Sequence, residues 1–200
     1  MIPDNRRRWT RGPGTTVFEN RWISLHTYDA IAPTGAHTDY GVVHMKNLAL
    51  GVLPIDDQGC TRLVGQERFV FDQYSWELPE GGGDPALPPI EGAKRELSEE
   101  AGLKADHWLP LFENVQLSNS VTDERAFAFI AWGLSPDSSW EKDPSEDLAV
   151  RHVPFSEAVA MAVSGEISDA FSLVMLLKAD HLARTGALPG PLQRLLLAGG

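Results

Sequence analysis

Residues 95–103 of the chain read Arg95-Glu96-Leu97-Ser98-Glu99-Glu100-Ala101-Gly102-Leu103. The glutamates at 96, 99 and 100 have the i, i+3, i+4 spacing, which places them on one face of a helix. Like charges at this spacing repel one another, so a helix selected for stability alone would avoid them. A hard divalent cation such as Mg²⁺ binds oxygen ligands and would remove the repulsion. The stretch therefore indicates a metal-binding helix.

A loop rich in glycine and proline, from Leu78 to Pro89, precedes this helix. We expect the helix to begin near Pro89, because proline suits a first helical turn. It should end at Gly102, which is a plausible left-handed C-cap. The run Gly81-Gly82-Gly83 lets the loop backbone turn tightly and approach a diphosphate and its metals.

Loop and helix together resemble the Nudix box, in which a glycine loop leads into a helix ending in Arg-Glu-aliphatic-any-Glu-Glu-any-Gly-aliphatic. The box covers 23 residues, and eight of its nine defined positions match this chain. The resemblance implies that Glu96 and Glu100 bind Mg²⁺ or Mn²⁺, with Glu99 binding directly or supporting them. Arg95 is expected to brace the loop or the carboxylates.

One position departs from the family pattern, because Leu87 stands where a glutamate is usual. In the family that glutamate supports the junction of loop and helix and often contacts an outer metal. We expect Leu87 to pack beneath the loop and Asp84 to compensate in part. The departure leaves the number of bound metals open.

The segments before the box narrow the resemblance to ADP-ribose and nucleoside-diphosphate-sugar pyrophosphatases. They read Gln66-Glu67-Arg68-Phe69 and Trp76-Glu77-Leu78-Pro79-Glu80-Gly81. The likeness implies that Arg68 contacts substrate phosphates and that the backbone carbonyl of Glu80, in place of the usual alanine, binds metal. Glu77 either hydrogen-bonds a ribose or nucleobase or pairs with a nearby arginine.

Two later segments follow the order of the same subfamily. Ser145-Glu146-Asp147-Leu148 precedes a strand, and Gly165-Glu166-Ile167-Ser168-Asp169-Ala170 opens the last helix. The resemblance implies a catalytic glutamate in the acidic loop, and Glu146 is our choice; a merely solvated acidic loop is the alternative. The loop from Ser118 to Glu124 corresponds to one that shapes a sugar-side pocket, although it lacks the glycine usual in ADP-ribose enzymes.

The remaining patterns predict an α+β fold. Expected strands are 22–28, 40–45, 48–53, 61–64, 111–117, 126–133 and 150–153, with a hairpin turn at 56–59 and later helices at 156–163 and 169–184. The resemblance implies a Nudix-type α/β/α sandwich with a mixed β-sheet and an N-terminal antiparallel β-element. We expect residues 1–40 to form a tail and this β-element, at or across a dimer interface, and residues 41–200 to form the hydrolase domain.

Composition limits the partners of the chain. Its 200 residues carry 28 acidic and 17 basic side chains, a formal charge of −11, which argues against nucleic-acid and anionic-membrane binding. Cys60 is the only cysteine, so we expect neither an intrachain disulfide nor a cysteine-based zinc site. A reducing cytoplasm is the expected location, and no apolar run approaches the roughly 20 residues of a spanning helix.

The expected activity is Mg²⁺- or Mn²⁺-dependent hydrolysis of the pyrophosphate bond in a nucleoside diphosphate sugar or ADP-ribose, which gives a nucleoside monophosphate and a sugar phosphate. A homodimer is implied by the subfamily resemblance. Two alternatives stay open: a Nudix hydrolase for a dinucleoside polyphosphate, nucleoside triphosphate or coenzyme, and a Nudix-like module that binds a nucleotide sugar without cleaving it.

Overall fold

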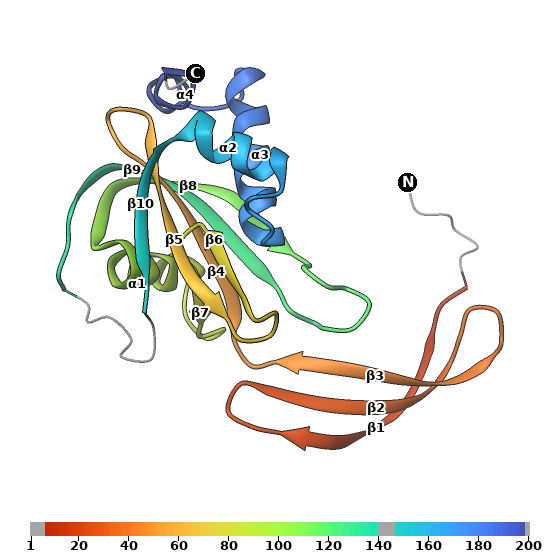
Figure 1. The fold of residues 1–200 in the computed structure, drawn as a ribbon. Coiled ribbons are helices and arrows are strands. Elements are labelled where there is room, and N and C mark those ends of the chain that lie inside the picture. Colours follow the sequence, from red (N-terminus) through yellow and green to blue (C-terminus); the bar gives the residue numbers. More distant parts are fainter. Residues whose placement is uncertain (1–6, 140–146, 199–200) are drawn as a thin grey trace. The chain divides into compact units, whose positions relative to one another are not determined.

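The computed structural model of the chain describes residues 7–139 and 147–198. Its backbone contacts divide into two compact units, Met1–Asn47 with Ser118–Glu124 and Leu48–Leu117 with Arg125–Gly200. Figure 1 shows the elements of both units in chain order. Among the described residues, no helix is long and apolar enough to cross a membrane.

The first unit is an antiparallel three-stranded sheet, as expected for the N-terminal β-element. Its strands are β1 (Thr10–Glu19), β2 (Ile23–Ile31) and β3 (His37–Met45), in the order β1-β2-β3. The segment Ser118–Glu124 binds to β3 through the backbone, with Val43 N donating to Val121 O at 2.9 Å. The Tyr40 hydroxyl also donates to Ser120 O at 2.7 Å.

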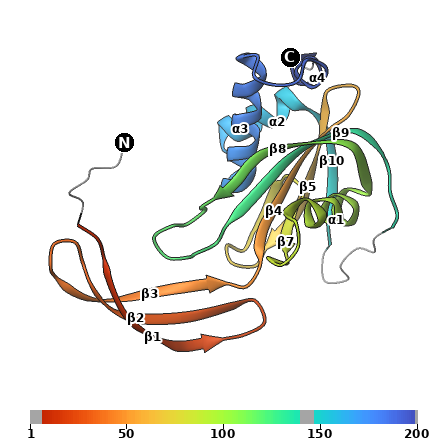
Figure 2. The ribbon, with the colours of Figure 1, turned by 180° about the vertical axis from the view of Figure 1, so that it is seen from behind.

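The second unit is built on two sheets. Strands β7 (Glu80–Gly83), β4 (Leu48–Ile55), β9 (Ala126–Pro136) and β8 (Leu103–Val115) form a mixed sheet in that order, with β4 and β9 parallel. Strands β10 (Ala149–Pro154), β5 (Cys60–Arg68) and β6 (Gln73–Glu77) form an antiparallel sheet. Figure 2, the view from behind, shows β8 and β9 side by side.

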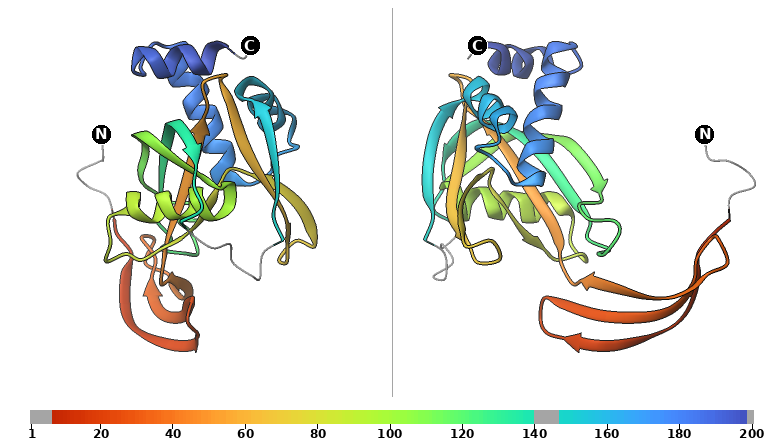
Figure 3. Two further views of the ribbon diagram at one scale, coloured as in Figure 1. Left: turned by 90° about the vertical axis from the view of Figure 1, so that its left-hand side faces the viewer. Right: turned by 45° about the vertical axis from the view of Figure 1, so that its right-hand side comes forward.

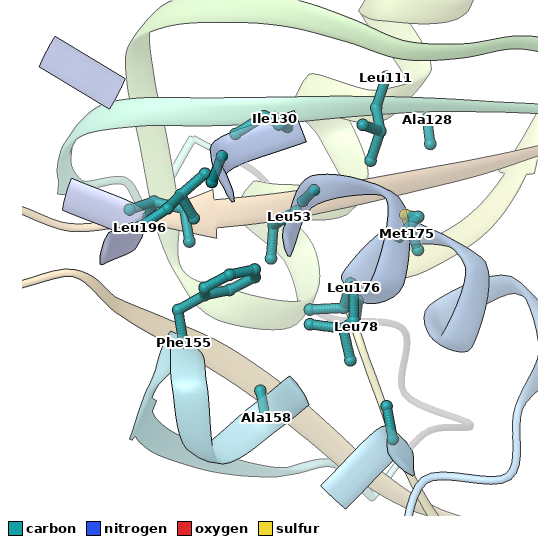
Figure 4. Close-up of a cluster of buried hydrophobic side chains, with 14 of the residues drawn as sticks. Leu53, Leu78, Leu111, Ala128, Ile130, Phe155, Ala158, Met175, Leu176 and Leu196 are labelled. Atoms are coloured by element: carbon teal, nitrogen blue, oxygen red, sulfur yellow. The ribbon is translucent and has the colours of Figure 1, made fainter. Parts of the chain in front are cut away.

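Helices cover both faces of the mixed sheet, and the views in Figure 3 show α1 (Pro89–Ala101) and α3 (Ala170–Arg184) on opposite sides of β4. Helix α1 buries Ala93 and Leu97 against Val52, Phe129 and Ala131. The other face packs against α2 (Phe155–Ser164), α3 and α4 (Gly190–Ala198). Figure 4 shows part of this larger core, which includes Leu53, Ile130, Phe155, Met175 and Leu196. The expected α/β/α sandwich is therefore confirmed.

The structure differs from the sequence predictions at four places. The turn at 56–59 is present, but β4 and β5 belong to different sheets because β4 pairs with β7 and β9, so the expected hairpin is wrong. The expected loop from Leu78 to Pro89 contains strand β7, whose glycines pair with β4. Strand β8 begins at Leu103, directly after the helix, and α4 lies beyond the last helix expected from the sequence.

Candidate active site

Helix α1 has the boundaries that the sequence predicts. Pro89 occupies the first turn, and no side chain caps the N-terminus. At the other end Gly102 adopts the left-handed conformation, with φ of 66°, and its N–H donates to Ser98 O at 3.0 Å. A residue with a side chain is strained at that φ, so glycine fixes where the helix stops.

The glutamates of α1 lie at the interface with the mixed sheet. Glu96 and Glu100 are buried, at 6% and 4% exposure. The Glu80 N–H donates to Glu100 Oε2 at 2.9 Å. Buried carboxylates are costly unless hydrogen bonds or cations compensate them, and here the Glu80 N–H contacts Glu100 and the Arg95 guanidinium contacts Glu96.

Arg95 joins the helix to the glycine strand. Its guanidinium contacts the carboxylates of Glu96 and Glu99, and its Nη2 donates to Gly82 O at 2.7 Å. One side chain thus contacts both the loop and two of the three glutamates. Because a guanidinium presents several donors in a fixed plane, it holds these acceptors in one geometry.

Strand β7 approaches α1 closely because three of its four residues are glycine. A Cβ on Gly81 would lie 2.4 Å from Glu96 Cδ, and a Cβ on Gly83 would lie 2.3 Å from Leu50 Cδ1. On the helix itself, a Cβ on Gly92 would lie 2.2 Å from the same Leu50 atom. Glycine at these positions lets the backbone and the carboxylates share one small volume.

Arg68 and Glu77 pair beside this strand. Arg68 Nε donates to Glu77 Oε1 at 2.8 Å, and a second guanidinium nitrogen contacts Glu77 Oε2. Glu77 is 3% exposed, whereas the Arg68 side chain is 39% exposed. Of the two expectations for Glu77, pairing with an arginine is therefore the one that the geometry displays.

Glu80 points toward the start of α3. Its Oε1 lies 3.6 Å from Arg68 Nη2, and Ser172 Oγ donates to its Oε2 at 3.4 Å. Ser172 Oγ also accepts from Leu78 N at 2.8 Å, which ties α3 to the strand segment. Burial, and then the negative charges of Asp169 and Glu77, raise the pKa of Glu80 well above its ordinary value.

One expectation about the loop is wrong, because Leu87 is 57% exposed and does not pack beneath the loop. Asp84 closes its own turn, with Oδ1 accepting from Ala86 N at 2.8 Å. Its partial compensation for the missing glutamate stays a prediction. In the same tight turn between β7 and α1, Leu87 N donates to Asp84 O at 3.1 Å.

The structure brings together Arg68, Glu77, Glu80, Arg95, Glu96, Glu99 and Glu100 in the second unit. Glu146 and its acidic neighbours Glu141 and Asp143 lie outside the described residues. Ser172 was missed, because a serine in a helix carries no pattern that reveals a buried partner 94 positions away. The nearest available signal was Asp169 at the helix start, a typical N-cap.

The loop Ser118–Glu124 lines a pocket of about 250 Å³ within the first unit, together with Trp9, Tyr28, Tyr40 and His44. His44 Nδ1 lies 2.6 Å from Asp123 Oδ2, and His44 Nε2 lies 2.8 Å from the Tyr28 hydroxyl. Since an ionised carboxylate only accepts, Nδ1 carries the proton shared with Asp123, and a neutral His44 accepts from Tyr28.

This fold and its glutamate helix define a Nudix hydrolase: the NUDIX domain family matches residues 45–171, and the chain belongs to that family. It is 34% identical over 147 residues to an ADP-ribose pyrophosphatase of Mycobacterium tuberculosis, covering 72% of this chain and 70% of that protein. It is 28% identical over 174 residues to a GDP-mannose pyrophosphatase of Yersinia enterocolitica, covering 80% of this chain and 89% of that protein. A solved structure of an ADP compounds hydrolase superposes with a TM-score of 0.81 at 21% identity, over 93% of this chain and all of that one, which supports the fold.

Proposed function

We propose that this Nudix enzyme hydrolyses the pyrophosphate bond of a nucleoside diphosphate sugar or ADP-ribose. The products are a nucleoside monophosphate and a sugar phosphate. The observation that carries the proposal is the pair of buried carboxylates, Glu96 and Glu100, packed one helical turn apart against β7. The relatives that are pyrophosphatases for ADP-ribose and GDP-mannose support this substrate class.

The donor set fits Mg²⁺ or Mn²⁺. Glu96, Glu100 and Glu99 offer carboxylate oxygens, and the carbonyl of Glu80 would complete the set, so all ligands are the hard oxygens these cations prefer. When bound, the ions neutralise the diphosphate and lower the pKa of water at the site. Arg95 holds Glu96 and Glu99 in place from the side of the glycine strand.

Substrate binding is assigned to Arg68 and Glu77. The part of the Arg68 guanidinium that stays exposed is available for phosphate oxygens, while Glu77 fixes its orientation from the buried side. We assign the orientation or deprotonation of the attacking water to Glu146, on the subfamily resemblance alone. A homodimer and a cytoplasmic location belong to the same proposal.

The test compares Glu96→Gln and Glu100→Gln with Glu91→Gln, an exposed residue on the same helix that pairs with Lys94. With saturating Mg²⁺, the first two variants should lose roughly a hundredfold or more in kcat, because the cooperating carboxylates act as a unit. Glu91→Gln should match the parent chain. Mn²⁺ binding, followed by electron paramagnetic resonance, should weaken in the same two variants; full activity in Glu100→Gln would contradict that assignment.

Product identification on a panel of nucleotide sugars, dinucleoside polyphosphates and nucleoside triphosphates separates the alternatives. Release of inorganic pyrophosphate from a triphosphate would replace our proposal by the second activity. Leu87 is the observation that favours a non-catalytic module, because the loop lacks its usual glutamate. Tight nucleotide-sugar binding without turnover across Mg²⁺ and Mn²⁺ titrations would establish that module instead.

A further inference from the structure

We propose that Asp56, Cys60 and His152 form a binding site for a thiophilic divalent cation such as Zn²⁺, separate from the Nudix glutamates. One ligand atom from each residue lies within 4.8 Å of the other two. His152 Nε2 is 2.6 Å from Asp56 Oδ2. The three side chains therefore already converge on one point at the turn between β4 and β5.

Backbone hydrogen bonds hold these residues in place. Asp56 Oδ1 accepts from Gln58 N and Cys60 N, each at 2.9 Å, which leaves Oδ2 directed toward His152. Asp56 N donates to Cys60 O at 3.0 Å and closes the turn. The pairing of β5 with β10 sets Cys60 opposite Pro154 and Arg62 opposite His152. A site built on paired strands needs little rearrangement to bind an ion.

The ligand chemistry differs from that of the Nudix helix. Sulfur, imidazole nitrogen and one carboxylate oxygen suit Zn²⁺, whereas Mg²⁺ prefers oxygen alone. Binding forms a bond from the Cys60 sulfur to the ion and releases the thiol proton to solvent. Without metal, the Nε2 of His152 carries the proton that it shares with the ionised Asp56 Oδ2. Binding moves that proton to Nδ1 through solvent, so that neutral Nε2 and the Asp56 oxygen both become ligands, and water takes the remaining position. Burial first, and then the charge of Asp56, raise the pKa of the Cys60 thiol, so the metal must displace a proton.

The two sites lie at different points along β4. Gly51, in the middle of the strand, pairs with Glu80, whereas Asp56 follows its last residue, Ile55. Four residues of strand from Gly51 to Ile55 span roughly 13 Å. The proposal revises the expectation that one cysteine allows no cysteine-based zinc site, because Asp56 and His152, 96 positions apart in the sequence, meet only through the fold.

The Arg62 guanidinium would compete with a bound metal ion for the Asp56 carboxylate. Its Nη1 lies 3.6 Å from Asp56 Oδ2 and has no hydrogen-bond partner within the described parts of the chain. An arginine this close to a bound cation repels it. Replacing Arg62 by methionine should therefore tighten the site, a gain that a purely structural Asp56–His152 hydrogen bond does not predict.

The test uses metal-free full-length protein in saturating Mg²⁺, which fills the glutamate site. Co²⁺ is then added and displaced with Zn²⁺. Because Cys60 is the only cysteine, a thiolate-to-cobalt charge-transfer band reports this site alone. We expect the band to saturate at one equivalent of Co²⁺ per chain and to disappear when Zn²⁺ is added. Zn²⁺ should also raise the melting temperature of the protein.

Cys60→Ser should abolish the band and the Zn²⁺-induced rise in melting temperature. His152→Gln should weaken Co²⁺ binding roughly tenfold or more, and Arg62→Met should strengthen it. Asp57→Asn, in the same turn but outside the cluster, is the matched control and should bind like the parent chain. Absence of the band, or a band unchanged in His152→Gln, overturns the proposal. Circular dichroism of each variant verifies its fold, and nucleotide-sugar hydrolysis should be unaffected by Cys60→Ser.

Discussion

Arg68 and Glu77 form an ion pair that is buried at one end and solvated at the other. Breaking such a pair leaves the buried Glu77 carboxylate without a charged partner. Arg68→Met should lower the free energy of unfolding by about 1–3 kcal/mol, less than for a fully buried pair because Arg68 is 39% exposed. Urea denaturation measures the change.

The double variant Arg68→Met/Glu77→Gln is the control for this prediction. It removes the unpaired charge as well, so it should be more stable than Arg68→Met alone. If the two variants unfold at the same urea concentration, the unpaired Glu77 carboxylate costs nothing, and the loss of stability in Arg68→Met has another cause.

At the scale of single elements, the N-terminus of α3 depends on Asp169. Its side chain accepts from Ser172 N at 2.6 Å and caps the helix. Asp169→Ala should cost about 1 kcal/mol of stability, whereas Asp169→Asn keeps the acceptor and should cost less. Thermal unfolding of the three proteins checks this order; equal losses in both variants would assign the effect to charge rather than capping.

The segment Ser118–Glu124 gives the first unit a pH-dependent contact. Burial by itself raises the pKa of Asp123, but hydrogen bonds from His44 and from Met45 N–H outweigh it and hold the pKa below the ordinary 3.8. A lowered folded pKa stabilises the protein above the unfolded value, and that stabilisation disappears as the pH falls through the folded value. His44 also contacts the Tyr28 hydroxyl and the ring of His26, so these groups share the environment.

Asp123→Asn should therefore melt at a lower temperature than the parent chain at neutral pH, and the difference should shrink below about pH 4. Asp39→Asn, an exposed acid on β3, is the control and should show no such gap. A difference in melting temperature that is constant from pH 7 to pH 3 would mean that the Asp123 charge plays no part.

For the whole molecule, the proposed homodimer involves the free edge of the N-terminal sheet. Strand β1 is the edge, and Val17, Phe18 and Trp22 are at least half exposed. Unpaired edges with apolar side chains favour pairing with another chain. Light scattering at micromolar concentration should give twice the 21.9 kDa chain mass. Val17→Lys should lower the measured mass toward that of a monomer, whereas Val163→Lys on α2 should leave the mass unchanged. A monomeric parent chain would contradict the proposed homodimer.

The sequence predicted those parts of the molecule in which neighbouring residues carry the signal. Helix α1 was predictable from Pro89, Gly102 and the glutamates because caps and periodicity act within a few residues. The pairing of β4 with β9 was not predictable from the sequence. A turn after Ile55 has the same residue pattern whether the next strand returns to the same sheet or joins another. Contacts such as Ser172 with Leu78 depend on packing between distant segments, which no local pattern records.

The close approach of α1 to the sheet also couples three positions of the chain. Gly83 and Gly92 both place an absent Cβ within 2.3 Å of Leu50 Cδ1, so a side chain at either glycine requires Leu50 to change its rotamer or to become smaller. Leu50 is 1% exposed, so its side chain has little room to move. A shorter residue at 50 relieves both contacts at once, so the cost of a substitution at either glycine depends on which residue stands at 50.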